Sequence, residues 1–100
     1  MKKGIEYAIL TNEITKAWAG ITTKDYKGIK DLKKENLRDN MTNLELVLNM
    51  LAETSTTEIS KEKKPKTLSE NKRVAKKGGS VAGLARKDLE KKLGRSIINP

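Results

Sequence analysis

The chain contains neither cysteine nor histidine, so it lacks the side chains that usually hold a structural zinc ion or form a disulfide. The same absences remove the commonest general base and the thiol nucleophile of enzyme active sites. Catalysis would have to rest on carboxylates, lysine, serine or tyrosine. We therefore expect a protein that is not an enzyme and that binds no metal ion or cofactor. The lack of disulfides fits a reducing compartment such as the cytosol.

Aromatic residues and long apolar runs are also scarce. The only aromatic residues are Tyr7, Trp18 and Tyr26, so aliphatic side chains must supply most of the core. This composition favours packed helices over a β-sandwich or β-barrel. No apolar run approaches the roughly 18 residues of a membrane-spanning helix, so we expect no membrane partner. A chain of 100 residues is predicted to form a single domain.

Apolar residues recur at spacings of three and four along most of the chain, which predicts an all-α fold of about four helices. The first covers residues 4–19 and ends at Gly20, and a second, short helix begins at Thr22 or Thr23. A long central helix is predicted over about residues 43–60. A long basic C-terminal helix follows over about 67–93, after a basic connector at 61–66.

The predicted central helix begins with Thr42 and Glu45, which are spaced as a capping box. Its apolar stripe, widened by Val47 and Met50, indicates that this helix is the buried centre of the domain. The stripe consists of Met41, Leu44, Leu48 and Leu51.

The positive charge of the chain lies entirely in its last 40 residues. Residues 1–60 carry nine basic and nine acidic residues, whereas residues 61–100 carry thirteen basic and four acidic ones. The net charge of +9 is therefore confined to the C-terminal part. A basic element on one side of a protein is the electrostatic signature of a polyanionic partner such as nucleic acid.

The candidate binding residues form two clusters on the basic helix. In the first, spacings of four place Lys72 with Lys76, and Arg73 with Lys77, on neighbouring strips of one face. The second cluster, which groups Arg86 with Lys87, follows about two to four turns later. Such strips can contact successive phosphates and release counterions, which gives salt-sensitive binding without sequence preference. No aromatic residue lies between residues 61 and 100 to stack on bases. The alternative is that these charged residues only form a solvated helix face and bind no partner. The candidates are Lys72, Arg73, Lys76, Lys77, Arg86, Lys87 and Lys91.

Small residues interrupt this helix at residues 78–83, and each glycine inside a helix costs about 1 kcal/mol relative to alanine. We favour close helix packing as their role, through a groove formed by Gly78, Gly79, Ala82 and Gly83. The alternative is a helix break whose free N–H groups face an anion. If the helix is continuous, Gly79→Ala is expected to raise the melting temperature.

An acidic set, Glu35, Asp39 and Glu45, is the remaining candidate site. Glu35 and Asp39 are four residues apart and could share a metal ion on a helix. Lysine and arginine residues alternate with them, which is the ordinary pattern of surface ion pairs. We therefore expect ion pairs here and no metal site.

Residues 14–59 and 70–90 resemble the DNA-damage-inducible protein D family of bacteria. The most specific matching runs are KENLRD at 34–39, STTE at 55–58 and GGSVAG at 78–83. The resemblance covers residues from about 9 to 95. Family members carry an additional N-terminal domain similar to those of phage antirepressors, which is missing here.

The resemblance implies a cytoplasmic protein of the SOS response without known catalytic residues. It further implies a role in modulating the strand-exchange recombinase on single-stranded DNA. Our leading hypothesis is thus an accessory protein whose partner is the recombinase filament, single-stranded DNA, or both. The alternative belongs to a different class of function: it is a helical assembly domain, for example one that forms a homodimer through the glycine groove.

Overall fold

The computed structural model describes residues 3–99, with side chains from Glu6 onward, and all four helices predicted from the sequence are present. The all-α class is confirmed, because these residues contain no β-strand. A single 3₁₀ turn, Arg38–Asn40, lies in the loop before the third helix. The helices are α1 (Lys3–Ala19), α2 (Thr23–Ile29), α3 (Asn43–Lys63) and α4 (Leu68–Leu93).

Local capping signals set the helix boundaries. The N-cap threonines Thr22, Thr42 and Thr67 each accept a hydrogen bond from the backbone N–H three residues on. Gly20 and Gly94 adopt left-handed backbone conformations, with φ of 79° and 72°, where α1 and α4 stop. The predicted connector at 61–66 is shorter than expected, because α3 continues to Lys63.

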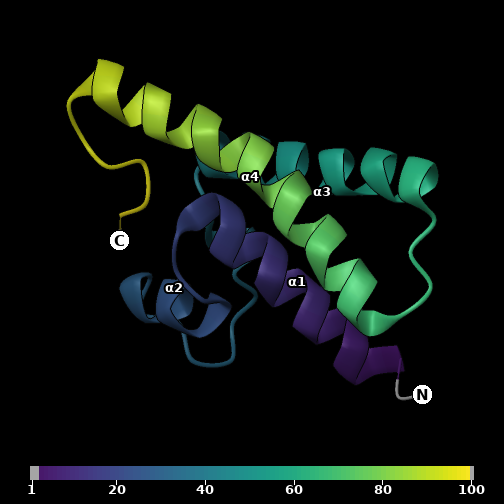
Figure 1. Cartoon of the computed structure of the whole chain (residues 1–100). Helices are drawn as coiled ribbons and strands as arrows, with labels where there is room; N and C mark the ends of the chain where they lie inside the picture. The colour runs from purple at the N-terminus through teal and green to yellow at the C-terminus, as the bar shows by residue number, and fades with distance from the viewer. Residues whose placement is uncertain (1–2, 100) are drawn as a thin grey trace.

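The centre of the domain is α4, not the helix at residues 43–63. Figure 1 shows α4 lying across both α1 and α3, which diverge from each other on either side of it. The prediction of a buried α3 is wrong for its outer face, where Val47 is 60% exposed and Met50 is 53% exposed. Only one face of α3 is covered, and its fully buried apolar residues are Leu48 and Ala52.

Two aromatic residues anchor the core beneath α4. Trp18 of α1 and Tyr26 of α2 are both 0% exposed, and their rings meet edge to face with centroids 6.0 Å apart. The indole N–H of Trp18 donates to the side-chain oxygen of Asn49, 3.2 Å away on α3. The core therefore joins α1, α2 and α3 through its few aromatic groups.

The C-terminal tail is part of this core, which the sequence did not indicate. After Gly94 the chain turns back toward α2 (Figure 1), and Ile97 is buried to 2% exposure. The backbone N–H of Ile97 donates to the Glu90 carboxylate at 3.0 Å. Burial by itself would raise the pKa of Glu90, but this bond and the nearby Arg86 guanidinium hold it below its usual value.

Within residues 3–99, no helix combines the length and the apolar character that crossing a membrane requires.

Candidate nucleic-acid interface

The outer side of α4 carries a row of exposed cations. Arg73 and Lys91 are eighteen residues apart, so they point in nearly the same direction five turns apart, along about 27 Å of helix. Their separation lets the row span several phosphates of an extended strand. We call the exposed residues Arg73, Lys76, Lys77, Lys87 and Lys91 the α4 basic face.

Lys72 lies at the edge of this face, beside α1. Its ammonium group is 3.9 Å from the Glu13 carboxylate, which Lys16 of α1 approaches at 4.0 Å. Glu13 is 8% exposed, and its second carboxylate oxygen has no hydrogen-bond partner within the described part of the chain. Lys72 thus offsets a buried acid, while 42% of its side chain stays exposed to solvent.

Arg86 lies in the contact between α4 and α1, away from the α4 basic face. Its Nε donates to the Trp18 carbonyl oxygen at 2.6 Å, and an Nη atom lies 2.7 Å from Glu90. Only 14% of its side chain is exposed. The sequence grouped Arg86 with Lys87, but the structure places these neighbours on different sides of the helix. Arg86 joins α1 to α4 and, through Glu90, to the C-terminal tail.

The C-terminal turn of α4 contains a local ion pair beside the α4 basic face. The Lys92 ammonium donates to Asp88 at 2.8 Å, and this hydrogen bond raises the pKa of Lys92. Both side chains are well exposed, so the pair adds little to stability. Asp88 is thus largely neutralised by Lys92, which leaves Lys87 and Lys91 free to contact a polyanion.

The small residues at 78–83 lie where α4 crosses its two neighbours. A Cβ atom built on Gly78 would lie 2.5 Å from the backbone nitrogen of Thr56 on α3. One built on Gly83 would lie 2.5 Å from the carbonyl oxygen of Ala17 on α1. Ala82 is 0% exposed between these two crossings. The glycines allow both backbones to approach α4 closely.

The alternative of a helix break at Gly78 is wrong, because α4 is continuous through residues 68–93. The expected gain from Gly79→Ala is also wrong. A Cβ atom on Gly79 would lie 2.8 Å from the Ile14 carbonyl oxygen and would also collide with the Ala17 side chain. The steric conflict outweighs the helix-propensity gain of about 1 kcal/mol. Gly79→Ala should therefore lower the melting temperature.

The acidic set at 35, 39 and 45 does not come together as a site. No cluster of three potential metal ligands exists among the described residues. Arg38, expected to pair with its acidic sequence neighbours, instead makes two hydrogen bonds to Glu53 of α3, at 3.0 and 3.3 Å. Glu45 is 0% exposed and belongs to a different, buried cluster.

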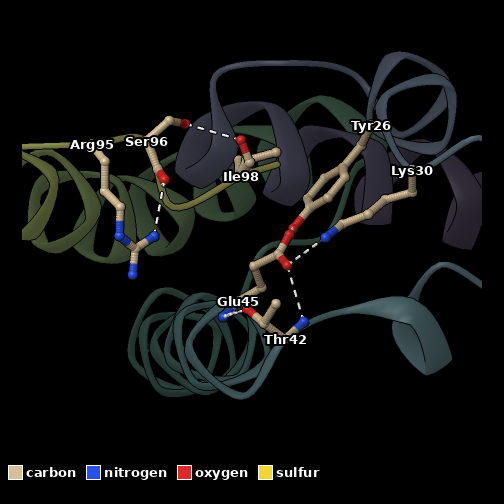
Figure 2. A network of polar contacts seen from close by, with 7 residues as sticks. All are labelled: Tyr26, Lys30, Thr42, Glu45, Arg95, Ser96 and Ile98. Atoms are coloured by element: carbon tan, nitrogen blue, oxygen red, sulfur yellow. Dashed lines mark hydrogen bonds and ion pairs between the residues drawn. The ribbon is translucent and has the colours of Figure 1, made fainter. Parts of the chain in front are cut away.

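The buried cluster surrounds the Glu45 carboxylate at the start of α3, as Figure 2 shows. The Tyr26 hydroxyl donates to one carboxylate oxygen, and the Lys30 ammonium lies 2.7 Å from the other. The backbone N–H of Thr42 also donates to Glu45, at 3.0 Å, which completes the predicted capping box. The Glu45 side chain thus caps α3 and links this helix to α2.

Burial and hydrogen bonding act in opposite directions on Glu45. Burial alone would raise its pKa, but donors on Lys30, Tyr26 and Thr42 outweigh it, so the pKa lies below its ordinary value. For Tyr26 both effects agree: burial, together with its bond to Glu45, raises the pKa of the phenol well above its usual value. The cluster is therefore stable as a neutral phenol with an ionised carboxylate and ammonium.

The lowered pKa of Glu45 predicts that the fold is sensitive to acid. A carboxyl group whose pKa is lower in the folded state stabilises the fold above its unfolded pKa of about 4.3. This contribution is lost as the pH falls through the folded value. We expect the free energy of unfolding, measured by urea denaturation, to decrease steadily below about pH 4.5. Glu45→Gln should flatten this decrease, and an unchanged acid profile in that variant would contradict the assignment.

No protein-family model, curated protein or solved structure matches this chain.

Proposed function

We propose that this protein is a non-enzymatic accessory factor of the DNA-damage response that binds single-stranded DNA, or the recombinase filament formed on it. Binding occurs through the α4 basic face. The observation that carries the proposal is the exposure of Arg73, Lys76, Lys77, Lys87 and Lys91 on one side of the longest helix. The resemblance of residues 14–59 and 70–90 to the DNA-damage-inducible protein D family supports the choice of partner and a cytoplasmic location.

Contacts to phosphates would dominate such binding. The α4 basic face carries ammonium and guanidinium groups but no aromatic ring. Each cation that neutralises a phosphate releases condensed counterions, so the affinity should fall steeply with salt concentration. Because α4 is held by α1 on one side and α3 on the other, the backbone positions that carry these charges are fixed relative to one another. Binding therefore has to order the side chains of this face but not its backbone.

The direct test is a fluorescence-anisotropy titration of labelled single-stranded DNA, with and without the recombinase, across a series of salt concentrations. The proposal predicts that binding weakens by more than tenfold between about 50 and 200 mM salt if at least three phosphates are contacted. Tight binding that does not respond to salt would contradict phosphate contacts. Absence of binding to both DNA and filament would contradict the proposed function.

A second candidate function is self-assembly, which a different observation favours. The glycine groove is no longer available for it, because α1 and α3 of the same chain fill that groove. Several large apolar side chains are nonetheless exposed on the two longest helices. They are Val47, Met50 and Leu51 of α3 and Val81, Leu84 and Leu93 of α4. Sedimentation equilibrium separates the candidates, since a monomer at tens of micromolar protein would exclude a stable dimer.

A further inference from the structure

A cleft of about 690 Å³ opens between α1 and α3, beneath the first turns of α4. It is bordered on its remaining side by α2 and by the loop at residues 34–38. The cleft exists because α1 and α3 both pack along α4 but make few contacts with each other. Its volume falls within the range of small-molecule sites, about 300–1,000 Å³. Neither the packing of the core nor the α4 basic face accounts for the presence of this cleft.

The lining of the cleft is apolar in one part and aromatic in another. Leu10 and Ile14 of α1 and Val74 of α4 contribute aliphatic surface. Tyr7, also in the lining, is 73% exposed, whereas the other two aromatic residues of the chain are fully buried. An exposed ring beside an aliphatic surface is a platform on which a flat heterocycle can stack.

Polar groups in the same cleft complement the edge of a heterocycle. Asn49 uses its carbonyl oxygen to accept from Trp18, which leaves its NH₂ group as a donor in the cleft lining. Asn71 uses its NH₂ group on the Thr67 carbonyl, which leaves its oxygen as an acceptor. A donor and an acceptor held by backbone and core contacts can recognise the hydrogen-bonding edge of a base.

The cations in the cleft suit an anionic substituent on such a ligand. Lys27 of α2 and Lys34 of the following loop both contribute to the lining, and neither forms an ion pair within residues 3–99. The third cation, Arg38, is engaged by Glu53 at 3.0 Å. Glu35 also lines the cleft, so its three cations outnumber its two carboxylates by one, which favours an anionic substituent such as a phosphate over a cationic group.

We infer that this cleft binds a nucleotide, with the base between Tyr7 and the aliphatic surface and the phosphate beside Lys27 and Lys34. The nucleotide is either a free mononucleotide or the 5′-phosphorylated end of a DNA strand. These two sources share the chemistry that the cleft recognises. The site is separate from the α4 basic face and does not rest on the proposed function.

The test is an NMR titration of the full chain with deoxyadenosine monophosphate, monitored at the side-chain amides of Asn49 and Asn71. The inference predicts saturable shifts at both amides. Tyr7→Ala should weaken binding about tenfold, and Tyr7→Phe should retain most of the affinity. Lys34→Ala should weaken binding severalfold, whereas the matched variant Lys24→Ala, outside the cleft, should leave it unchanged.

Two further arms identify the source and separate this inference from the proposed function. A 5′-phosphorylated oligonucleotide that shifts the same amides more tightly than the mononucleotide identifies a strand end, and equal or weaker binding identifies a free nucleotide. A variant lacking Lys77, Lys87 and Lys91 should still bind the mononucleotide. Absence of saturable shifts up to about 10 mM nucleotide, or an unchanged affinity in Tyr7→Ala, would overturn the inference.

Discussion

Replacing Glu45 by alanine should lower the free energy of unfolding by about 3–5 kcal/mol, because it leaves the buried Lys30 ammonium without its counter-charge. The Lys30 side chain is only 5% exposed, so its ammonium group lies largely out of contact with bulk water. The Tyr26 hydroxyl and the N-terminus of α3 lose their acceptor in the same step. Urea denaturation followed by circular dichroism measures the change.

Two comparisons distinguish buried charge from other effects of the Glu45 substitution. Glu53→Ala also removes an ion-paired glutamate from α3, but its side chain is 39% exposed, so the cost should be at most about 1 kcal/mol. Glu45→Gln retains an acceptor for Tyr26 but still leaves Lys30 charged. Adding Lys30→Met to Glu45→Gln should therefore recover much of the lost stability. Equal costs for Glu45→Ala and Glu53→Ala would contradict this account.

Gly78→Ala should destabilise the protein by about 3 kcal/mol, although alanine is the better helix former. The added Cβ atom would lie 2.5 Å from both the nitrogen and the Cα of Thr56, so one helix backbone must move. For a domain of this size the melting temperature should fall by roughly 10–20 °C. Thermal unfolding monitored by circular dichroism is the measurement.

Gly28 of α2 provides the matched control for Gly78. It also lies within a helix, but a Cβ atom built there meets nothing within 4 Å. Gly28→Ala should thus stabilise the protein by up to about 1 kcal/mol. If α3 approaches α4 closely at Gly78, the changes in stability of the two glycine variants must have opposite signs. A Gly78→Ala variant as stable as the unmodified protein would exclude that approach.

Helix boundaries were predictable because their signals are local. Thr42 and Glu45 are three residues apart, and the capping box that they form depends only on the backbone between them. Gly20 and Gly94 likewise stop their helices through their own left-handed conformations. The observed bounds of α1 and α4 differ from the predicted ones by no more than about a residue, which is within the usual uncertainty of helix ends.

Burial was less predictable, because periodicity shows that a helix has an apolar face but not which helix will cover it. Val47 and Met50 extend the apolar pattern of α3, yet they face solvent because α4 packs only on the opposite side. The same limitation explains the error at Gly79. Helix propensity is a property of one residue, whereas the collision with α1 depends on a backbone more than sixty positions away.

The candidate interface was predicted in part. The spacing of Arg73 and Lys77 placed them on one face, and the structure leaves both exposed. Arg86 is another basic residue of the same helix, so the sequence suggested the same role for it. In the structure it instead donates to the Trp18 carbonyl oxygen, 68 positions earlier in the chain. The buried role of Glu45 was equally hidden, since Tyr26 and Lys30 approach it from another helix. A sequence pattern cannot reveal such long-range partners.

The central claim is that phosphates contact the α4 basic face, and the salt dependence of DNA binding in charge-matched variants tests it most directly. One triple variant replaces Lys77, Lys87 and Lys91 by glutamine, and the control replaces Lys24, Lys33 and Lys61, which are exposed elsewhere. Both lower the net charge equally. The account predicts that the slope of log affinity against log salt falls by about 2 in the first variant only. Equal slopes in the two variants would show that overall charge, and not this face, binds the strand.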